Sequence, residues 1–174
     1  MSAAFPLSAG RTDEHYTPPE VFAALGCQFD LDPCQPDEGR AFISVPADNF
    51  YTRADNGLTQ PWSGFVWLNP PFGGRNGIVP WLQKFLDHGN GIALANALTS
   101  CGWFHDFAPQ MDAILFPKGK TKFVRPDGEI GKSPQNGIVL MGLGKRAVNA
   151  LASAQRNGFG LMLTACDTRA GENA

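Results

Sequence analysis

Short apolar runs alternate with stretches of helical spacing along most of the chain. Apolar runs bounded by turn residues predict strands at 29–32, 65–68, 91–95, 112–116, 121–124, 137–141 and 160–164. Apolar residues three and four positions apart predict helices at 17–26, 78–88, 103–107 and 145–155. In the first helix we expect Thr17 as N-cap, Pro18 at the first position and Glu20 completing a capping box. Residues 35–61 are polar and interrupted by glycine and proline, which predicts an irregular connection.

The order of these elements predicts an α/β fold. Strands that alternate with helices are typical of a mostly parallel sheet with helices on both faces. No helix separates 112–116 from 121–124, so we expect these strands to form an antiparallel pair near the C-terminal end. The pattern shows neither a repeat nor a linker, which predicts a single domain over residues 1–174 with flexible ends at 1–12 and 168–174.

The composition is that of an ordinary soluble protein, with 43% hydrophobic and 17% charged residues. The four cysteines form no CxxC pair and no histidine stands at metal-ligand spacing, so we expect free thiols in a reducing compartment and no metal. We find no leader pattern and no apolar run near the roughly 20 residues that span a bilayer. The sequence therefore predicts a cytoplasmic protein without membrane contact.

Positive charge is concentrated in one segment, although the net charge is −2. Between residues 115 and 146, seven lysines and arginines stand against two acidic residues. Lys118, Lys120 and Lys122 occupy alternate positions and would share one face of the strand expected at 121–124, with Arg125 just beyond. A basic surface of this kind suits nucleic-acid phosphates, so these four residues are candidate phosphate contacts.

The strand expected at 65–68 is followed by Asn69-Pro70-Pro71-Phe72. Pro71 forces Pro70 into an extended shape, and neither proline nitrogen can donate to a ladder. The loop is therefore stiff, its carbonyl oxygens can face a ligand, and Asn69 adds a side-chain oxygen acceptor. Phe72 adds a flat apolar face.

This set of groups suits methyl transfer to the exocyclic amine of adenine. That amine is a poor nucleophile, because its lone pair is delocalised into the ring. The Asn69 side-chain oxygen and the Pro70 carbonyl can accept hydrogen bonds from its two N–H groups. These bonds favour a more tetrahedral nitrogen and stabilise the positive charge that develops there. Phe72 can stack on the base, which must leave the duplex to be reached.

Several segments together carry a resemblance to a known family. In chain order these segments lie at 13–19, 29–34, 56–58, 61–64, 66–73, 103–106 and 116–120. Over roughly residues 13 to 143 the chain resembles the phage and prophage DNA N-6-adenine-methyltransferase (Dam-like) family. The resemblance implies a Rossmann-like class I methyltransferase fold and a site-specific, adenine-specific DNA-methyltransferase that uses S-adenosyl-L-methionine. It also implies double-stranded DNA as partner, a monomer or weak dimer with no obligate protein partner, and a bacterial host cell.

The resemblance assigns roles to particular residues. Residues 69–72 match the family's DPPY-type catalytic loop, with Asn for Asp and Phe for Tyr, which keeps the acceptor and the stacking face. Tyr16, Thr17 and Pro18 match the element that lies against the methionine part of the cofactor. Residues Asp32, Pro33 and Cys34 match the first cofactor-binding strand end, where a carboxylate reaches the ammonium group.

The chain also departs from the family's pattern. No glycine-rich GxG loop follows Asp32, and Leu98-Thr99-Ser100-Cys101 stands where relatives often carry an Arg-Thr-Asp-type stretch. The chain has no room for a large target-recognition domain, so sequence specificity is expected from loops at 73–77 or 125–135. Two biological roles stay open, protection of a phage genome and pairing with a nuclease in restriction-modification.

Other functions remain alternatives. An RNA or a protein amine or amide can be the substrate, because the loop suits several planar amines. A catalytically silent nucleic-acid-binding relative is a further alternative, motivated by the altered stretch at 98–101. Cys34 follows Pro33 as in carbon-5 cytosine methylation, but transfer to an amine needs no covalent step, which disfavours that chemistry. We interpret His105 as structural.

Overall fold

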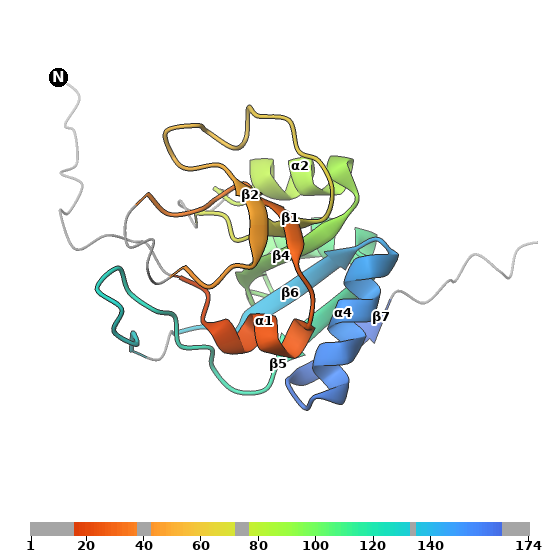
Figure 1. Cartoon of the computed structure of the whole chain (residues 1–174). Helices are drawn as coiled ribbons and strands as arrows, with labels where there is room; N and C mark the ends of the chain where they lie inside the picture. Colours follow the sequence, from red (N-terminus) through yellow and green to blue (C-terminus); the bar gives the residue numbers. More distant parts are fainter. Residues whose placement is uncertain (1–15, 38–42, 72–76, 133–134, 165–174) are drawn as a thin grey trace, which may run out of the picture.

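The computed structural model describes residues 16–37, 43–71, 77–132 and 135–164. In this part of the chain, seven strands form one sheet and four α-helices pack against it (Figure 1). The strands are β1 (Phe29–Asp32), β2 (Ala47–Phe50), β3 (Val66–Leu68), β4 (Gly91–Asn96), β5 (Ala113–Pro117), β6 (Ile138–Leu143) and β7 (Gly160–Thr164). The helices are α1 (Pro19–Leu25), α2 (Val79–His88), α3 (Gly102–Phe107) and α4 (Lys145–Arg156), and a 3-10 turn, η2 (Ala108–Gln110), follows α3.

The sheet is mixed, and the prediction of a mostly parallel sheet is wrong. Its order is β2-β1-β3-β4-β6-β5-β7, and the first four strands of this order pair in parallel. β6 runs antiparallel to both β4 and β5, and β7 runs antiparallel to β5. Every residue of β6 is buried. A continuous apolar run is also typical of an interior parallel strand, so hydrophobicity alone does not reveal its direction.

The predicted pairing of 112–116 with 121–124 is also wrong. Residues 121–124 form no strand; only Val124 makes isolated bridges, to Tyr16 and to Ile130. The antiparallel partners of β5 are instead β6 and β7. The segment alternates lysine with partly buried residues, and Phe123 is its one buried side chain, so it offers a sheet too little apolar surface.

Two further local predictions fail for identifiable reasons. The N-cap of α1 is Pro18, with φ −72° and ψ 151° and without a side-chain cap, so Thr17 and Glu20 form no capping box. Pro19 follows Pro18 and excludes it from the helical region. β2 lies within the connection predicted to be irregular; it is an edge strand with three exposed residues, so it lacks an apolar signal.

Helices cover both faces of the sheet, as predicted. On one face α1 and α4 pack over strand residues that include Phe29 and Trp67. On the other face α2 and α3 pack over residues that include Val66 and Leu68. Alternate residues of β3 thus enter opposite cores, which fixes its register. None of the helices in the described ranges is long and apolar enough to cross a membrane.

Candidate functional site

A pocket opens where the chain reverses its direction of travel across the sheet. From β1 the chain goes to β2 on one side, and later passes to β3 and β4 on the other. Such a switch point leaves a crevice at the carboxyl ends of the strands. The crevice encloses about 270 Å³, its open mouth included. Its lining residues are Tyr16, Thr17, Asp32, Cys34, Pro36, Ile43, Ser44, Val45, Trp67 and Asn69.

Asp32, the last residue of β1, is only 2% exposed. Its Oδ1 accepts a hydrogen bond of 3.0 Å from the backbone N–H of Cys34. Burial raises the pKa of the Asp32 carboxyl to about 7, although the Cys34 N–H acts in the opposite direction. A buried carboxyl without a cationic partner in the described structure is suited to meet the positive charge of a ligand.

Asn69 follows β3 directly and turns its amide toward Thr17. The Asn69 Nδ2 donates to Thr17 Oγ1 over 3.3 Å, which joins two residues far apart in sequence. The amide nitrogen is therefore engaged with Thr17, and the acceptor Oδ1 is left for another group. Pro70 is buried and Pro71 exposed, while the predicted stacking residue Phe72 lies outside the described residues.

The segment around Gly57 packs against the turn that follows Asp32 but does not line the pocket. A Cβ on Gly57 would stand 2.1 Å from the Pro33 carbonyl oxygen, so only glycine lets this segment approach the turn after Asp32. The Gly57 carbonyl accepts from Trp62 Nε1 at 2.8 Å and from Lys84 Nζ at 3.1 Å. These segments of the family resemblance therefore act through packing.

One lining residue carries an unused donor. The indole Nε1 of Trp67 is buried and has no hydrogen-bond partner among the described residues. A buried N–H without a partner costs about 1–3 kcal/mol, which a ligand acceptor can offset. The lining of the pocket thus includes a residue with an acidic group, Asp32, and a residue with an unpartnered donor, Trp67. The periodicity of 65–68 marked Trp67 only as a core residue, and nothing in the sequence singled out Ser44.

Five of the site residues proposed from the sequence are among the ten that line the pocket. Tyr16, Thr17, Asp32, Cys34 and Asn69 meet in the pocket, although three separate segments supply them. Pro18, Pro33 and Pro70 adjoin lining residues and Pro71 follows Pro70, but none of the four lines the pocket. Their contribution is to shape the backbone, since a proline fixes φ and donates no hydrogen bond.

Cys34 is placed as an inert thiol. Burial first, and the neighbouring Asp32 second, raise its pKa well above the ordinary value. A thiol that resists ionisation is a poor nucleophile. Across the described ranges, no group of three or more His, Cys, Asp or Glu side chains is placed to hold a metal ion.

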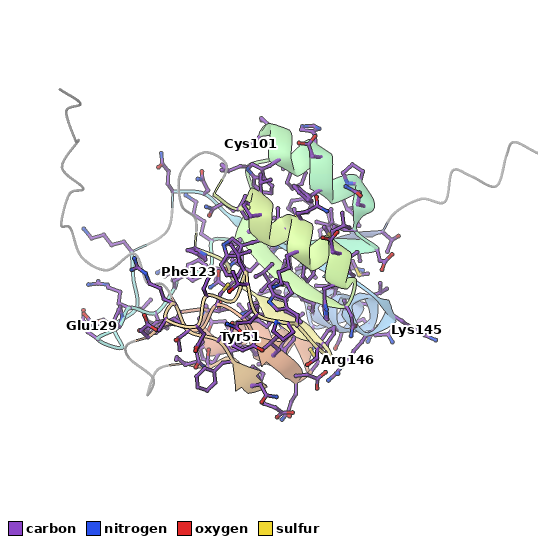
Figure 2. The ribbon with its side chains drawn as sticks, turned by 90° about the horizontal axis from the view of Figure 1, so that it is seen from above. Tyr51, Cys101, Phe123, Glu129, Lys145 and Arg146 are labelled. Carbon is purple, nitrogen blue, oxygen red and sulfur yellow. The ribbon has the colours of Figure 1, made fainter. Side chains whose placement is uncertain are left out.

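The basic segment lies at the same edge of the sheet as the pocket. Tyr16 lines the pocket and exchanges two backbone hydrogen bonds with Val124, of 2.9 and 3.0 Å. Figure 2 shows Phe123 and Glu129 on the side of the molecule opposite Lys145 and Arg146. The predicted phosphate contacts Lys118, Lys120 and Lys122 are exposed, and Arg125 is partly buried. The three lysines do not share a strand face, because no strand forms there.

Two of these basic residues already have partners. Lys120 donates to the Gln135 carbonyl at 3.2 Å, and Arg125 lies 4.0 Å from the Glu129 carboxylate. Both contacts are exposed, so they cost little to exchange for phosphate oxygens. The stretch at 98–101 follows β4 at the same edge of the sheet but does not line the pocket.

The sheet is open and has a pocket at its switch point, with an acidic group at the end of one strand and an amide at the end of the next. These features define the class of α/β proteins that bind a ligand at the carboxyl ends of the strands. The family model described as DNA N-6-adenine-methyltransferase (Dam) matches residues 7–146. The chain belongs to this family, and membership indicates DNA adenine methyltransferase activity. None of the curated proteins and none of the solved structures compared with the chain matches it.

Proposed function

We propose that this chain transfers a methyl group from S-adenosylmethionine directly to the exocyclic amine of an adenine extruded from double-stranded DNA. The observation that carries the proposal is the amide of Asn69, held at the mouth of a pocket that also contains the buried Asp32. The family match supports the reaction class. We further propose site-specific methylation by one domain in the cytoplasm of a bacterial host.

The pocket residues fit the methionine end of such a cofactor. When bound, S-adenosylmethionine supplies an electrophilic methyl group on its sulfonium. Asp32 would bind the ammonium group as a carboxylate, and Trp67 Nε1 offers a donor to the cofactor carboxylate. Tyr16 and Cys34 would complete the wall around them.

Asn69 and Pro70 would act on the target amine. The Asn69 Oδ1 and the Pro70 carbonyl would accept hydrogen bonds from its two N–H groups. They would stabilise the positive charge that develops as the N–C bond forms. The methylated nitrogen then loses its extra proton to water, so the reaction requires no general base from the protein. Phe72 would stack on the extruded base.

Phosphate contacts would come from the connection between β5 and β6. Lys118 and Lys122 are exposed there, and Lys120 and Arg125 can exchange their weak partners for phosphate. Each such contact adds affinity without reading sequence, and the salt dependence of binding reports their number.

The test is transfer of tritiated methyl to unmethylated duplex DNA, with the nucleosides resolved afterwards. We expect label in N6-methyladenine. Asn69→Ala should lower kcat by about 100-fold or more, since it removes one charge-stabilising acceptor. Asn149→Ala, on the exposed face of α4, is the matched control and should retain activity.

Other outcomes would identify the alternatives. Label in RNA or protein but not in DNA would indicate another amine or amide substrate. Cofactor binding without transfer to any of these substrates would favour the silent nucleic-acid-binding relative. Full turnover by Asn69→Ala would contradict the role given to the amide.

A further inference from the structure

Thr17 is a buried polar residue whose hydroxyl faces the catalytic loop. Thr17 and Asp32 are the two buried polar or charged residues in the described ranges, each 2% exposed. Asp32 has a ready role as a charge partner, whereas a threonine before a helix is ordinarily its N-cap. Here the hydroxyl receives the Asn69 amide instead, and α1 has no side-chain cap.

The backbone holds Thr17 in place independently of Asn69. Its carbonyl accepts a hydrogen bond of 2.5 Å from Ser44 Oγ. The preceding residue, Tyr16, is fixed by its two backbone bonds to Val124, and the Pro18 carbonyl accepts from Val21 N–H at 3.1 Å. Thr17 is therefore anchored on both sides, so its hydroxyl can orient the Asn69 side chain rather than follow it.

Orientation matters for an asparagine, because the two ends of its amide have opposite hydrogen-bonding character. With Nδ2 on Thr17, the Oδ1 acceptor is free for a ligand amine. With the amide turned by half a rotation, the Thr17 hydroxyl could donate to Oδ1 instead, but the Asn69 NH₂ donor would then meet the NH₂ donor of the target, and the amine could not bind productively. An aspartate at this position would have two acceptor oxygens and would need no such control.

We infer that Thr17 is a positioning residue, whose hydroxyl accepts Asn69 Nδ2 and thereby holds the side chain in place with Oδ1 toward the target amine. The inference rests on the proposed function and adds to it the group that makes asparagine an effective acceptor in this loop. A misoriented catalytic group commonly costs about 100-fold in rate. Loss of the Thr17 hydroxyl is therefore expected to lower kcat by roughly 10- to 100-fold.

The experiment compares Thr17→Val, which replaces the hydroxyl by a methyl group of similar shape, with Thr17→Ser, which keeps the hydroxyl. Thr59→Val is the matched control, because the Thr59 hydroxyl bonds within an exposed turn, to the Asn56 carbonyl. For each variant we would measure kcat and KM on duplex DNA, the Kd of S-adenosylhomocysteine by calorimetry, and Tm without ligand.

We expect Thr17→Val to lose kcat while its Kd for S-adenosylhomocysteine stays within about twofold, a split that a purely structural defect would not produce. Thr17→Ser and Thr59→Val should keep the wild-type kcat. If Thr17→Val does not fold, Thr17→Ala takes its place, and Thr17→Ser remains decisive in either case.

Three outcomes would overturn the inference. An unchanged kcat in Thr17→Val would show that the hydroxyl does not orient the amide. A weaker Kd at unchanged kcat would show that it holds the cofactor instead. A kcat loss in Thr17→Ser comparable to that in Thr17→Val would show that the hydroxyl is not the group that matters. Absence of transfer by the wild-type protein is a separate result, which would refute the proposed function and with it the premise of the inference.

Discussion

Two aspartates of one strand show how the ends of the sheet differ. Asp30, near the start of β1, has a side chain that is 43% exposed and accepts from the Phe65 N–H and from Arg146 at 3.4 Å. Asp32, two residues later, is buried and accepts from Cys34 N–H alone among the bonds described for its side chain. The exposed Asp30 carboxylate has partners from two other segments of the chain, whereas the buried Asp32 carboxyl has one partner, from the turn that follows it.

The difference indicates which end of the sheet serves stability and which serves ligand binding. At the amino end, Arg146 also donates to the Gln28 carbonyl at 2.8 Å and lies 4.5 Å from the centre of the Phe65 ring. Polar groups there are satisfied by the protein itself. At the carboxyl end, Asp32 and Trp67 Nε1 keep capacity that the protein does not use. Incompletely satisfied buried groups destabilise a fold, so they persist where a ligand completes them.

The largest effect is expected from Asp32→Asn. Loss of a buried charge partner costs about 2–5 kcal/mol of binding, so the Kd of S-adenosylhomocysteine should rise by at least about 30-fold. At pH 8 the variant should unfold at a higher temperature than the wild type, because no charge is buried. Calorimetry and thermal unfolding measure the two quantities.

Asp30→Asn is the matched control, with the same chemical change two residues away. We expect it to leave the Kd unchanged and to lower Tm, since Asp30 supports the Phe65 N–H and Arg146. Equal changes in Kd for the two variants would remove the distinction between the two ends of the sheet.

The next effect concerns the pH dependence of wild-type stability and ligand affinity, which should follow the ionisation of Asp32. Its pKa is raised to about 7, so the folded protein holds this proton more tightly than the unfolded chain does. The contribution of Asp32 to stability therefore falls as the pH rises from about 4 to 7. It is complete only at a pH below the pKa of this carboxyl in the unfolded chain. The affinity for a ligand with an ammonium group changes in the opposite direction, because the ionised carboxylate binds it. We expect this affinity to increase about tenfold between pH 6 and pH 8.

Asp32→Asn provides the control for both pH dependences, that of stability and that of the Kd. Its Kd should be independent of pH over this interval, and its stability advantage over the wild type should vanish below about pH 4, where both side chains are neutral. Cys34 does not contribute, because its thiol stays protonated throughout. A wild-type Kd that does not vary between pH 6 and pH 8 would refute Asp32 as the ammonium partner.

The smallest effect is expected from Arg146→Gln at the amino end. The variant loses an exposed ion pair and the contact with the Phe65 ring, which together are worth about 1 kcal/mol. Urea denaturation should show this loss in the free energy of unfolding. The Kd of S-adenosylhomocysteine and kcat should be unchanged, and a shift in either would mean that the two ends of the sheet are coupled.

The sequence predicted the elements that have strong periodicity or a turn residue at their ends. The four helices lie within about two residues of their expected ranges, and six of the seven expected strands form. β2 carries no apolar pattern, and the direction of β6 depends on where a connection returns the chain. Neither property is encoded in local hydrophobicity.

The candidate site was predictable where chemistry and position coincide. Asn69 and Asp32 stand at strand ends, and parallel neighbours bring such ends together. The contact of Asn69 with Thr17 joins residues that local patterns treat separately, and the sequence favoured a helix cap for that hydroxyl. The approach of Gly57 to Pro33 likewise depends on a tertiary contact, which no periodicity reports.

The reversed direction of β6 makes one part of this molecule interchangeable. Because β6 runs against β5, the chain leaves the sheet after Pro117 and re-enters it at Ile138 on the same side, where the pocket opens. A loop closed in this way can grow at a cost that rises only with the logarithm of its length, and neither strand has to move. An insertion in this connection can therefore change the surface beside the pocket while Asp32 and Asn69 keep their places.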